Sequence, residues 1–127
     1  MAKFLSKEWV EVVQTALQSS DQVKQATQSA QATIQQQITG GPEGDVSYHI
    51  MVDKGTVEAA LGEADSPTFV LATDYETAGK INRGETTGQA QMMTGKLKFQ
   101  GDMMKVMTLQ GAVQAIQGVL NTVPTEY

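Results

Sequence analysis

The hydrophobic period of the chain changes near residue 32, and this change constrains the fold more than any other feature. Before it, apolar side chains such as Leu5, Trp9 and Val13 recur at helical spacing, with polar side chains between them. After it, apolar and polar side chains alternate, which is typical of half-buried strands. The sequence therefore predicts two N-terminal helices, the second capped by Asp21, followed by a sheet.

Three of the expected strands form an antiparallel meander over residues 32–38, 46–52 and 57–61. A glycine-rich turn separates the first two strands, and Gly55 allows a tight hairpin between the second and third. A fourth strand over residues 68–73 is apolar on both faces, so we place it centrally in the sheet.

The rest of the chain alternates helices with one further strand. We expect short helices over residues 73–81 and 85–93, and a fifth strand over residues 96–100. A last long helix over residues 102–120 is apolar, rich in methionine and weakened by two glycines, each of which costs about 1 kcal/mol relative to alanine. We expect this helix to be mobile.

Length and composition indicate one domain over residues 1–127. The chain has no cysteine and one histidine, which excludes a zinc ribbon, a thiol nucleophile and a multi-histidine metal centre, so we expect no cofactor. A net charge of −5 argues against binding of duplex nucleic acid or of an anionic membrane. No run approaches the ~20 apolar residues of a transmembrane helix.

Targeting signals are not visible at either end of the sequence. The segment that begins at Met1 reaches charged residues before any apolar run, unlike a secretory signal. The segment that ends at Tyr127 is not a peroxisomal tripeptide. We therefore expect a cytoplasmic protein.

The segment Gly95–Met103, with the sequence GKLKFQGDM, resembles the signature near the end of the sterol carrier protein 2 (SCP-2) domain. In that family a GKLK motif, a hydrophobic residue and a second glycine precede an acidic or amide residue and a long apolar helix. Residues 46–55 are similar to the hairpin of the family, residues 67–71 to the next strand, and residues 79–93 to its helical insert. The resemblance covers residues 32–120.

This resemblance implies an α+β fold in which helices cover one face of a five-stranded mixed sheet. It also implies an apolar tunnel between the sheet and the helices. The ligand would be a lipid-like molecule such as a fatty acid, an acyl-CoA, a phospholipid or a sterol, and transient contact with a membrane would accompany its transfer.

Five of the seven methionines cluster within residues 92–107, and flexible thioether side chains suit a cavity for ligands of varied shape. For any single methionine, ordinary core packing is the alternative. With the neighbouring apolar side chains they predict the lining of the tunnel: Phe69, Leu71, Met92, Met93, Leu97, Phe99, Met103, Met104, Met107, Ile116 and Leu120.

Three basic side chains are candidates for contact with the charged head of an amphiphile at the tunnel mouth: Arg83, Lys96 and Lys105. A solvated strand face is the alternative for the lysines of the fifth strand, and capping of the preceding helix is the alternative for Arg83. Trp9 is expected to anchor the first helix in the core.

Catalysis has weak support in the sequence, because no nucleophile, base and orienting group occur together. His49 faces away from Tyr48 and Ile50 in its strand and has no obvious catalytic partner. The leading hypothesis is a lipid-binding and lipid-transferring protein, with no catalytic or metal-binding residue. Two alternatives stay open, an enzyme acting in the same pocket and a module whose methionine-rich helix binds a protein partner. The oligomeric state is left open.

Overall fold

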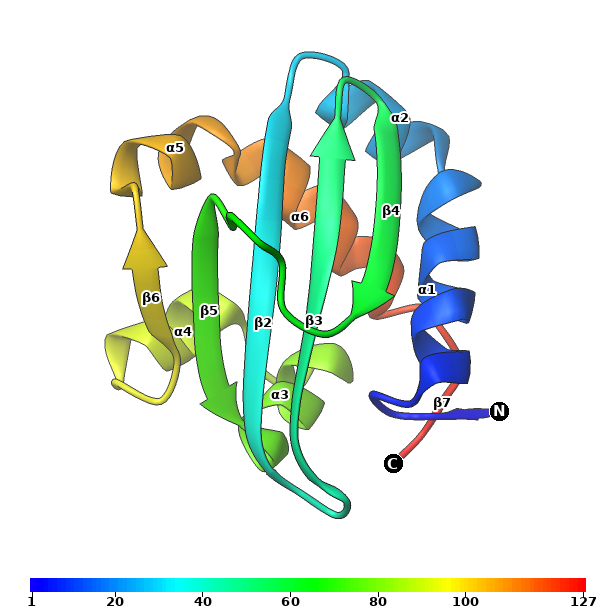
Figure 1. Cartoon of the computed structure of the whole chain (residues 1–127), viewed down its shortest axis with the longest axis vertical. Helices are drawn as coiled ribbons and strands as arrows, with labels where there is room; N and C mark the ends of the chain where they lie inside the picture. Colours follow the sequence, from blue (N-terminus) through cyan, green and yellow to red (C-terminus); the bar gives the residue numbers. More distant parts are fainter.

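Helices cover one face of a five-stranded mixed sheet in the computed structural model, which describes residues 1–127 (Figure 1). The expected α+β class and the mixed five-stranded sheet are confirmed. In chain order the elements are β1 (Ala2–Lys3), α1 (Lys7–Gln18), α2 (Asp21–Thr27), β2 (Gln31–Gly41), β3 (Gly44–Asp53), β4 (Thr56–Leu61), β5 (Phe69–Asp74), α3 (Tyr75–Asn82), α4 (Gly88–Met93), β6 (Lys98–Gly101), α5 (Met103–Thr108), α6 (Gln110–Leu120) and β7 (Thr125–Glu126).

The sheet has the order β4-β3-β2-β5-β6, in which only β2 and β5 are parallel. The parallel pair requires a crossover, and the loop between β4 and β5 provides it by passing over the face of the sheet that the helices leave free (Figure 1). We call this the outer face and the helix-covered one the inner face. The prediction for β5 is corrected: it has a neighbour on each side, but β2 occupies the centre.

Capping side chains explain where the helices begin. Ser6 accepts a hydrogen bond from the backbone N–H of Trp9 at the start of α1, and Asp74 accepts one from Thr77 at the start of α3. At α2 the capping residue is Ser20, whose hydroxyl accepts from the Val23 N–H, and not Asp21 as predicted. Asp21 lies in the first turn instead, where its negative charge interacts favourably with the positive end of the helix dipole.

The last helix is not continuous, contrary to the prediction, but consists of α5 and α6 with Leu109 between them. Leu109 has φ −95° and ψ 6°, in the sparsely populated bridge region. The hydrogen bonds from Leu109 N to Lys105 O and from Val113 N to Leu109 O persist through the break. The Leu109 side chain is buried, whereas α5 has no buried residue, so α6 follows the core and α5 departs from it.

The two ends of the chain pair with each other, which the hydrophobic period did not predict. Strands β1 and β7 form a small parallel sheet, too short to show any alternation. The indole Nε1 of Trp9 donates to Thr125 Oγ1 at 3.0 Å, and the rings of Phe4 and Trp9 meet edge to face. The prediction that Trp9 anchors the first helix is confirmed, because its side chain is fully buried.

The core lies between the inner face and helices α1, α2 and α6. Ile34, Ile50 and Val52 contribute to it from the sheet, as strand alternation predicts, and Leu17, Ile116 and Leu120 from the helices. None of the helices combines the length and the apolar character needed to cross a membrane.

Candidate functional site

One row of side chains across the inner face is incompletely covered by the helices. The strand register places Tyr48, Gln36, Leu71 and Phe99 next to one another on four adjacent strands. Tyr48 is buried, whereas Gln36, Leu71 and Phe99 are half-buried. The neighbouring row of the inner face is buried, since Ile34 and Phe69 are 5% and 2% exposed. The inner face is therefore accessible to solvent at the middle of the sheet and toward β6.

Apolar side chains from the last two helices extend this region. Val106 of α5 and Val113 and Val119 of α6 are partly buried and pack against the same core cluster as Leu71 and Phe99. The rings of Phe69 and Phe99 lie 5.6 Å apart in a tilted arrangement. We take Leu71, Phe99 and these helical side chains together as the candidate site, which draws on β5, β6, α5 and α6.

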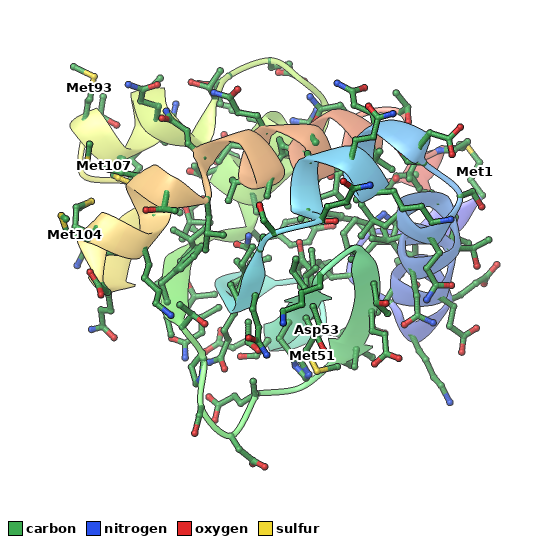
Figure 2. All side chains as sticks on the ribbon, turned by 90° about the horizontal axis from the view of Figure 1, so that it is seen from above. Met1, Met51, Asp53, Met93, Met104 and Met107 are labelled. Carbon is green, nitrogen blue, oxygen red and sulfur yellow. The ribbon has the colours of Figure 1, made fainter.

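The predicted tunnel residues fall into three groups in the structure. Buried are Phe69, Leu97, Ile116 and Leu120, and half-buried are Leu71, Met92 and Phe99. Exposed are Met93, Met103, Met104 and Met107. Figure 2 shows Met93, Met104 and Met107 pointing outward at one end of the molecule, so these side chains do not line an enclosed space in this structure.

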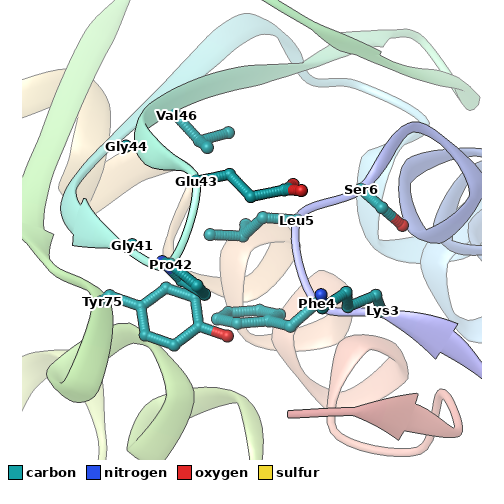
Figure 3. Close-up of a pocket in the computed structure, with 10 residues that line it drawn as sticks. All are labelled: Lys3, Phe4, Leu5, Ser6, Gly41, Pro42, Glu43, Gly44, Val46 and Tyr75. Carbon is teal, nitrogen blue, oxygen red and sulfur yellow. The ribbon is translucent and has the colours of Figure 1, made fainter.

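Two hollows of the molecule are lined by other residues. The one in Figure 3 lies where the tip of the β2–β3 hairpin meets Phe4, Leu5 and Tyr75, and its volume of about 30 Å³ suits one water molecule. The other has a volume of about 390 Å³ and opens widely on the outer face, between the loop after β4 and the side chains of His49 and Met51. Neither hollow is the predicted tunnel, which stays a prediction.

The head-group candidates lie apart from one another. The Arg83 side chain pairs with Glu85 and lies over the Tyr127 ring, 4.8 Å from its centre, at the end of α3. The side chain of Lys96 is exposed near Asp74, and its carbonyl accepts a hydrogen bond from Thr73. Lys105 projects from α5. Of the three, only Lys105 lies on a helix that contributes to the candidate site.

No hydrogen bond or ion pair joins the ionisable side chains of Asp74, Tyr48 and His49 to one another. Asp74 has a pKa below its ordinary value, chiefly because its carboxylate accepts a hydrogen bond from the Thr77 N–H. A general acid needs the opposite shift. Burial raises the pKa of Tyr48, which keeps this phenol neutral. His49 Nδ1 lies 2.9 Å from the carbonyl oxygen of Gly62 and ties the crossover loop to the outer face.

The structure contains no group of three or more histidine or acidic side chains that could hold a metal ion.

Sequence reasoning missed Gln36. Its side chain shares the inner face with the buried Ile34 and Ile38, and it makes no side-chain hydrogen bond within the protein. The signal was present in the sequence: a glutamine at an inward position of an otherwise apolar alternation. Burying an amide without a partner is costly, so such a position indicates access to solvent or to a ligand.

The sheet order, the crossover and the one-sided helices define an α+β domain with the fold of sterol carrier proteins. The chain superposes on a crystal structure of sterol carrier protein 2 with a TM-score of 0.82 and 18% identity, covering 96% of this chain and 100% of that one. A conserved hypothetical protein from Thermus thermophilus gives a TM-score of 0.80 and 18% identity, covering 99% and 93%. The palmitated SCP2L2 of Aedes aegypti gives 0.65 and 15%, covering 88% and 95%.

A family model places the chain more specifically. The model of the SCP-2 sterol transfer family matches residues 13–114, so the chain belongs to this family, as its GKLK segment predicts. No curated protein sequence matches the chain.

Proposed function

We propose that residues 1–127 act as one lipid-binding domain that takes up an acyl chain between the inner face and helices α5 and α6, and transfers it. The observation that carries this proposal is the half-buried row formed by Gln36, Leu71 and Phe99. A carrier needs apolar surface that is neither sealed in the core nor fully hydrated, and this row meets that need. Membership of the SCP-2 sterol transfer family supports it.

Partition supplies the driving force, and no covalent step is required. Each methylene moved from water to an apolar site contributes about 0.8 kcal/mol, so a long acyl chain gains enough to be held against its solubility in water. A fatty acid is the ligand class we propose. The palmitated state of the Aedes aegypti structure is a property of that protein and supports the choice.

Gln36 would orient the ligand. An amide offers one acceptor oxygen and two donor hydrogens, so it can bind a carboxylate, an ester or a hydroxyl without being charged itself. Its place at the centre of the sheet leaves the row from Leu71 to Phe99 for the hydrocarbon. The apolar row would then set affinity and the amide would set direction.

Entry would require α5 to move, and two features of the last helices support such a motion. Helix α5 has no buried side chain, and α6 is the element with which it packs most. The bridge-region conformation of Leu109 provides a hinge between them. Rotation about Leu109 would separate Val106 from the core and widen the space over Phe99.

A titration with a fluorescent fatty acid tests the proposal. We expect saturable uptake by the wild type and loss of uptake in Phe99→Asp. Burying the new carboxylate under the hydrocarbon of the probe is costly, and its charge repels the carboxylate of the probe. Leu61→Asp is the matched control, since Leu61 pairs with Tyr48 at the opposite edge strand and is 41% exposed. A flat response of the folded wild type, or equal uptake by both variants, would contradict the proposal.

We also propose that the protein is cytoplasmic, and this part of the proposal rests on the sequence alone. Fractionation of cells that express the chain, with detection in the cytosolic or another fraction, tests it.

A further inference from the structure

The exposed methionines gather at one end of the molecule. Met93 ends α4, and Met103, Met104 and Met107 belong to α5; they are 83%, 53%, 75% and 68% exposed. They make up half of the eight large apolar side chains that the whole molecule exposes. Elements α4, β6 and α5 lie together beyond β5, at the end of the sheet opposite α1 (Figure 1).

Lysines accompany these methionines. Lys96 precedes β6, Lys98 begins it and Lys105 lies in α5, and all three are exposed. We call the four methionines and three lysines the methionine–lysine edge. Figure 2 shows three of its methionines projecting away from the body of the molecule, on the side opposite Met1.

The charge of this end differs in sign from that of the chain. Residues 86–125 contain these three lysines and one acidic residue, Asp102, giving +2 in a chain of net charge −5. The Asp102 carboxylate is engaged as the cap of α5, accepting from the Met104 N–H at 2.9 Å. The net charge of the whole chain therefore does not describe the charge of this end.

We propose that the methionine–lysine edge docks on the surface of an anionic phospholipid bilayer. Flexible thioether side chains enter the boundary between head groups and acyl chains, and the lysines meet lipid phosphates. Each lysine near an anionic surface contributes about 1 kcal/mol, which is about fivefold in affinity. The combination of exposed apolar and basic side chains with almost no acidic ones favours docking on a membrane over exposure of this edge to water.

Helix α1 does not offer the same combination. Its exposed residues include Lys7, Glu8 and Glu11, and Val12 is its single exposed large apolar side chain. An anionic surface would repel the two glutamates, and one valine gives little area for insertion. The geometry therefore points to α5 and its neighbours.

Docking at this edge would serve the proposed lipid transfer and rests on that function for its purpose. Helix α5 carries three methionines of the edge and also Val106, which packs against the same core cluster as Leu71 and Phe99. Insertion of those methionines would hold α5 at the bilayer while the hinge at Leu109 opens. The acyl chain would then pass between bilayer and protein without crossing water.

Vesicle flotation with the full chain tests the docking directly. We use phosphatidylcholine vesicles with and without phosphatidylglycerol. The wild type is expected to float with the anionic vesicles, and binding should weaken as salt screens the lysines. The double variant Lys98→Gln/Lys105→Gln should lose about 25-fold in affinity, at about fivefold for each lysine. Met104→Gln/Met107→Gln should also bind more weakly. This loss should not depend on salt concentration, because the changes remove apolar side chains and no charge.

Matched controls remove the same side-chain types elsewhere. Lys7→Gln/Lys54→Gln carries the same change of charge on exposed residues outside the edge, and Leu61→Gln removes an exposed apolar side chain from β4. Both should bind anionic vesicles like the wild type. Circular dichroism melts confirm that every variant folds.

Three results would overturn the docking proposal. They are no flotation of the wild type, equal binding by edge and control variants, and a concentration-dependent dimer that the methionine changes abolish while vesicle binding persists. Uptake of the fluorescent fatty acid without vesicles separates this proposal from the proposed function. If the protein floats with vesicles but takes up no fatty acid, the docking proposal stands and the proposed carrier function fails. If it takes up fatty acid but does not float, the carrier function stands and the docking proposal fails.

Discussion

Single residues show what the sequence could and could not predict. The inward positions of Tyr48, Ile50 and Val52 followed from strand alternation, because alternation is a local property of an extended chain. The exposure of Met93 and of the α5 methionines did not, because helical spacing records which residues share a face but not whether another element covers that face. The inward position of Gln36 was visible in the strand alternation, but its partial exposure depends on where the helices end.

Replacing Gln36 by leucine separates affinity from orientation. We expect Gln36→Leu to fold with unchanged or greater stability, since an unpartnered amide becomes apolar. Binding of a fatty acid should fall by about tenfold, the effect of losing one hydrogen bond to a charged group. Isothermal titration with a fatty acid and with the matching fatty alcohol measures this; no loss of affinity for either ligand would contradict a role for the amide.

Asp74 gives a prediction about pH. Its lowered pKa means that the folded state binds its proton less tightly than the unfolded state, so the carboxylate stabilises the fold above its ordinary pKa of 3.8. That stabilisation is lost as the pH falls through the folded-state pKa. We expect Asp74→Ala to cost about 1 kcal/mol at neutral pH, as other lost N-caps do, and progressively less in acid.

Urea unfolding across acidic and neutral pH measures this difference. Asp74→Asn keeps an acceptor oxygen for the Thr77 N–H without a titrating group and should lie between wild type and Asp74→Ala. A difference between wild type and Asp74→Ala that does not shrink in acid would show that the charge of Asp74 is unimportant.

At the scale of elements, the local patterns predicted most helices and strands and failed at two places. The break at Leu109 is not visible in the sequence, because the apolar period and the backbone hydrogen bonds continue through it. It arises where the buried Leu109 holds α6 to the core while α5 turns away. The β1–β7 pair could not be predicted either, because it joins the two opposite ends of the chain.

Two glycines in α6 allow the hinge to be tested. A Cβ added at Gly111 or at Gly118 would meet no atom within 4 Å, so each can become alanine without a clash. Both changes should raise the free energy of unfolding by up to about 1 kcal/mol. Only Gly111→Ala, next to the break, should slow lipid exchange.

Stopped-flow release of the fluorescent fatty acid measures the exchange rate, and Gly118→Ala is the internal control. Equal rates in the two variants and the wild type would exclude Leu109 as the hinge for ligand entry.

At the scale of the whole molecule, the paired chain ends join one side, whereas α4 and α5 on the other side have no buried residue. Trp9, Thr125 and Phe4 connect α1 to β7 and β1, far from the methionine–lysine edge. We expect motion to be concentrated in α5 and its neighbours, because α4 and α5 have no buried side chain. The resemblance of the GKLK segment to the SCP-2 family predicted the fold, whereas the uneven packing became visible only in three dimensions.

A double-mutant cycle tests the closure of the chain ends. Trp9→Phe and Thr125→Val each remove one partner of the Nε1–Oγ1 hydrogen bond. We expect a coupling of about 1 kcal/mol in the free energy of unfolding, the usual net value of a neutral hydrogen bond. Fatty-acid uptake should be unaffected. Additive effects on stability would show that this bond contributes nothing to the closure.

The central claim is that an acyl chain lies on the inner face of the sheet, against Leu71 and Phe99 and under α5. Nuclear Overhauser effects from ¹³C-labelled palmitate to assigned protein protons test it most directly. The account predicts contacts from the palmitate methylenes to Leu71, Phe99 and Val106. Contacts to His49 and Met51 would place the ligand in the outer hollow instead, and they would contradict the account.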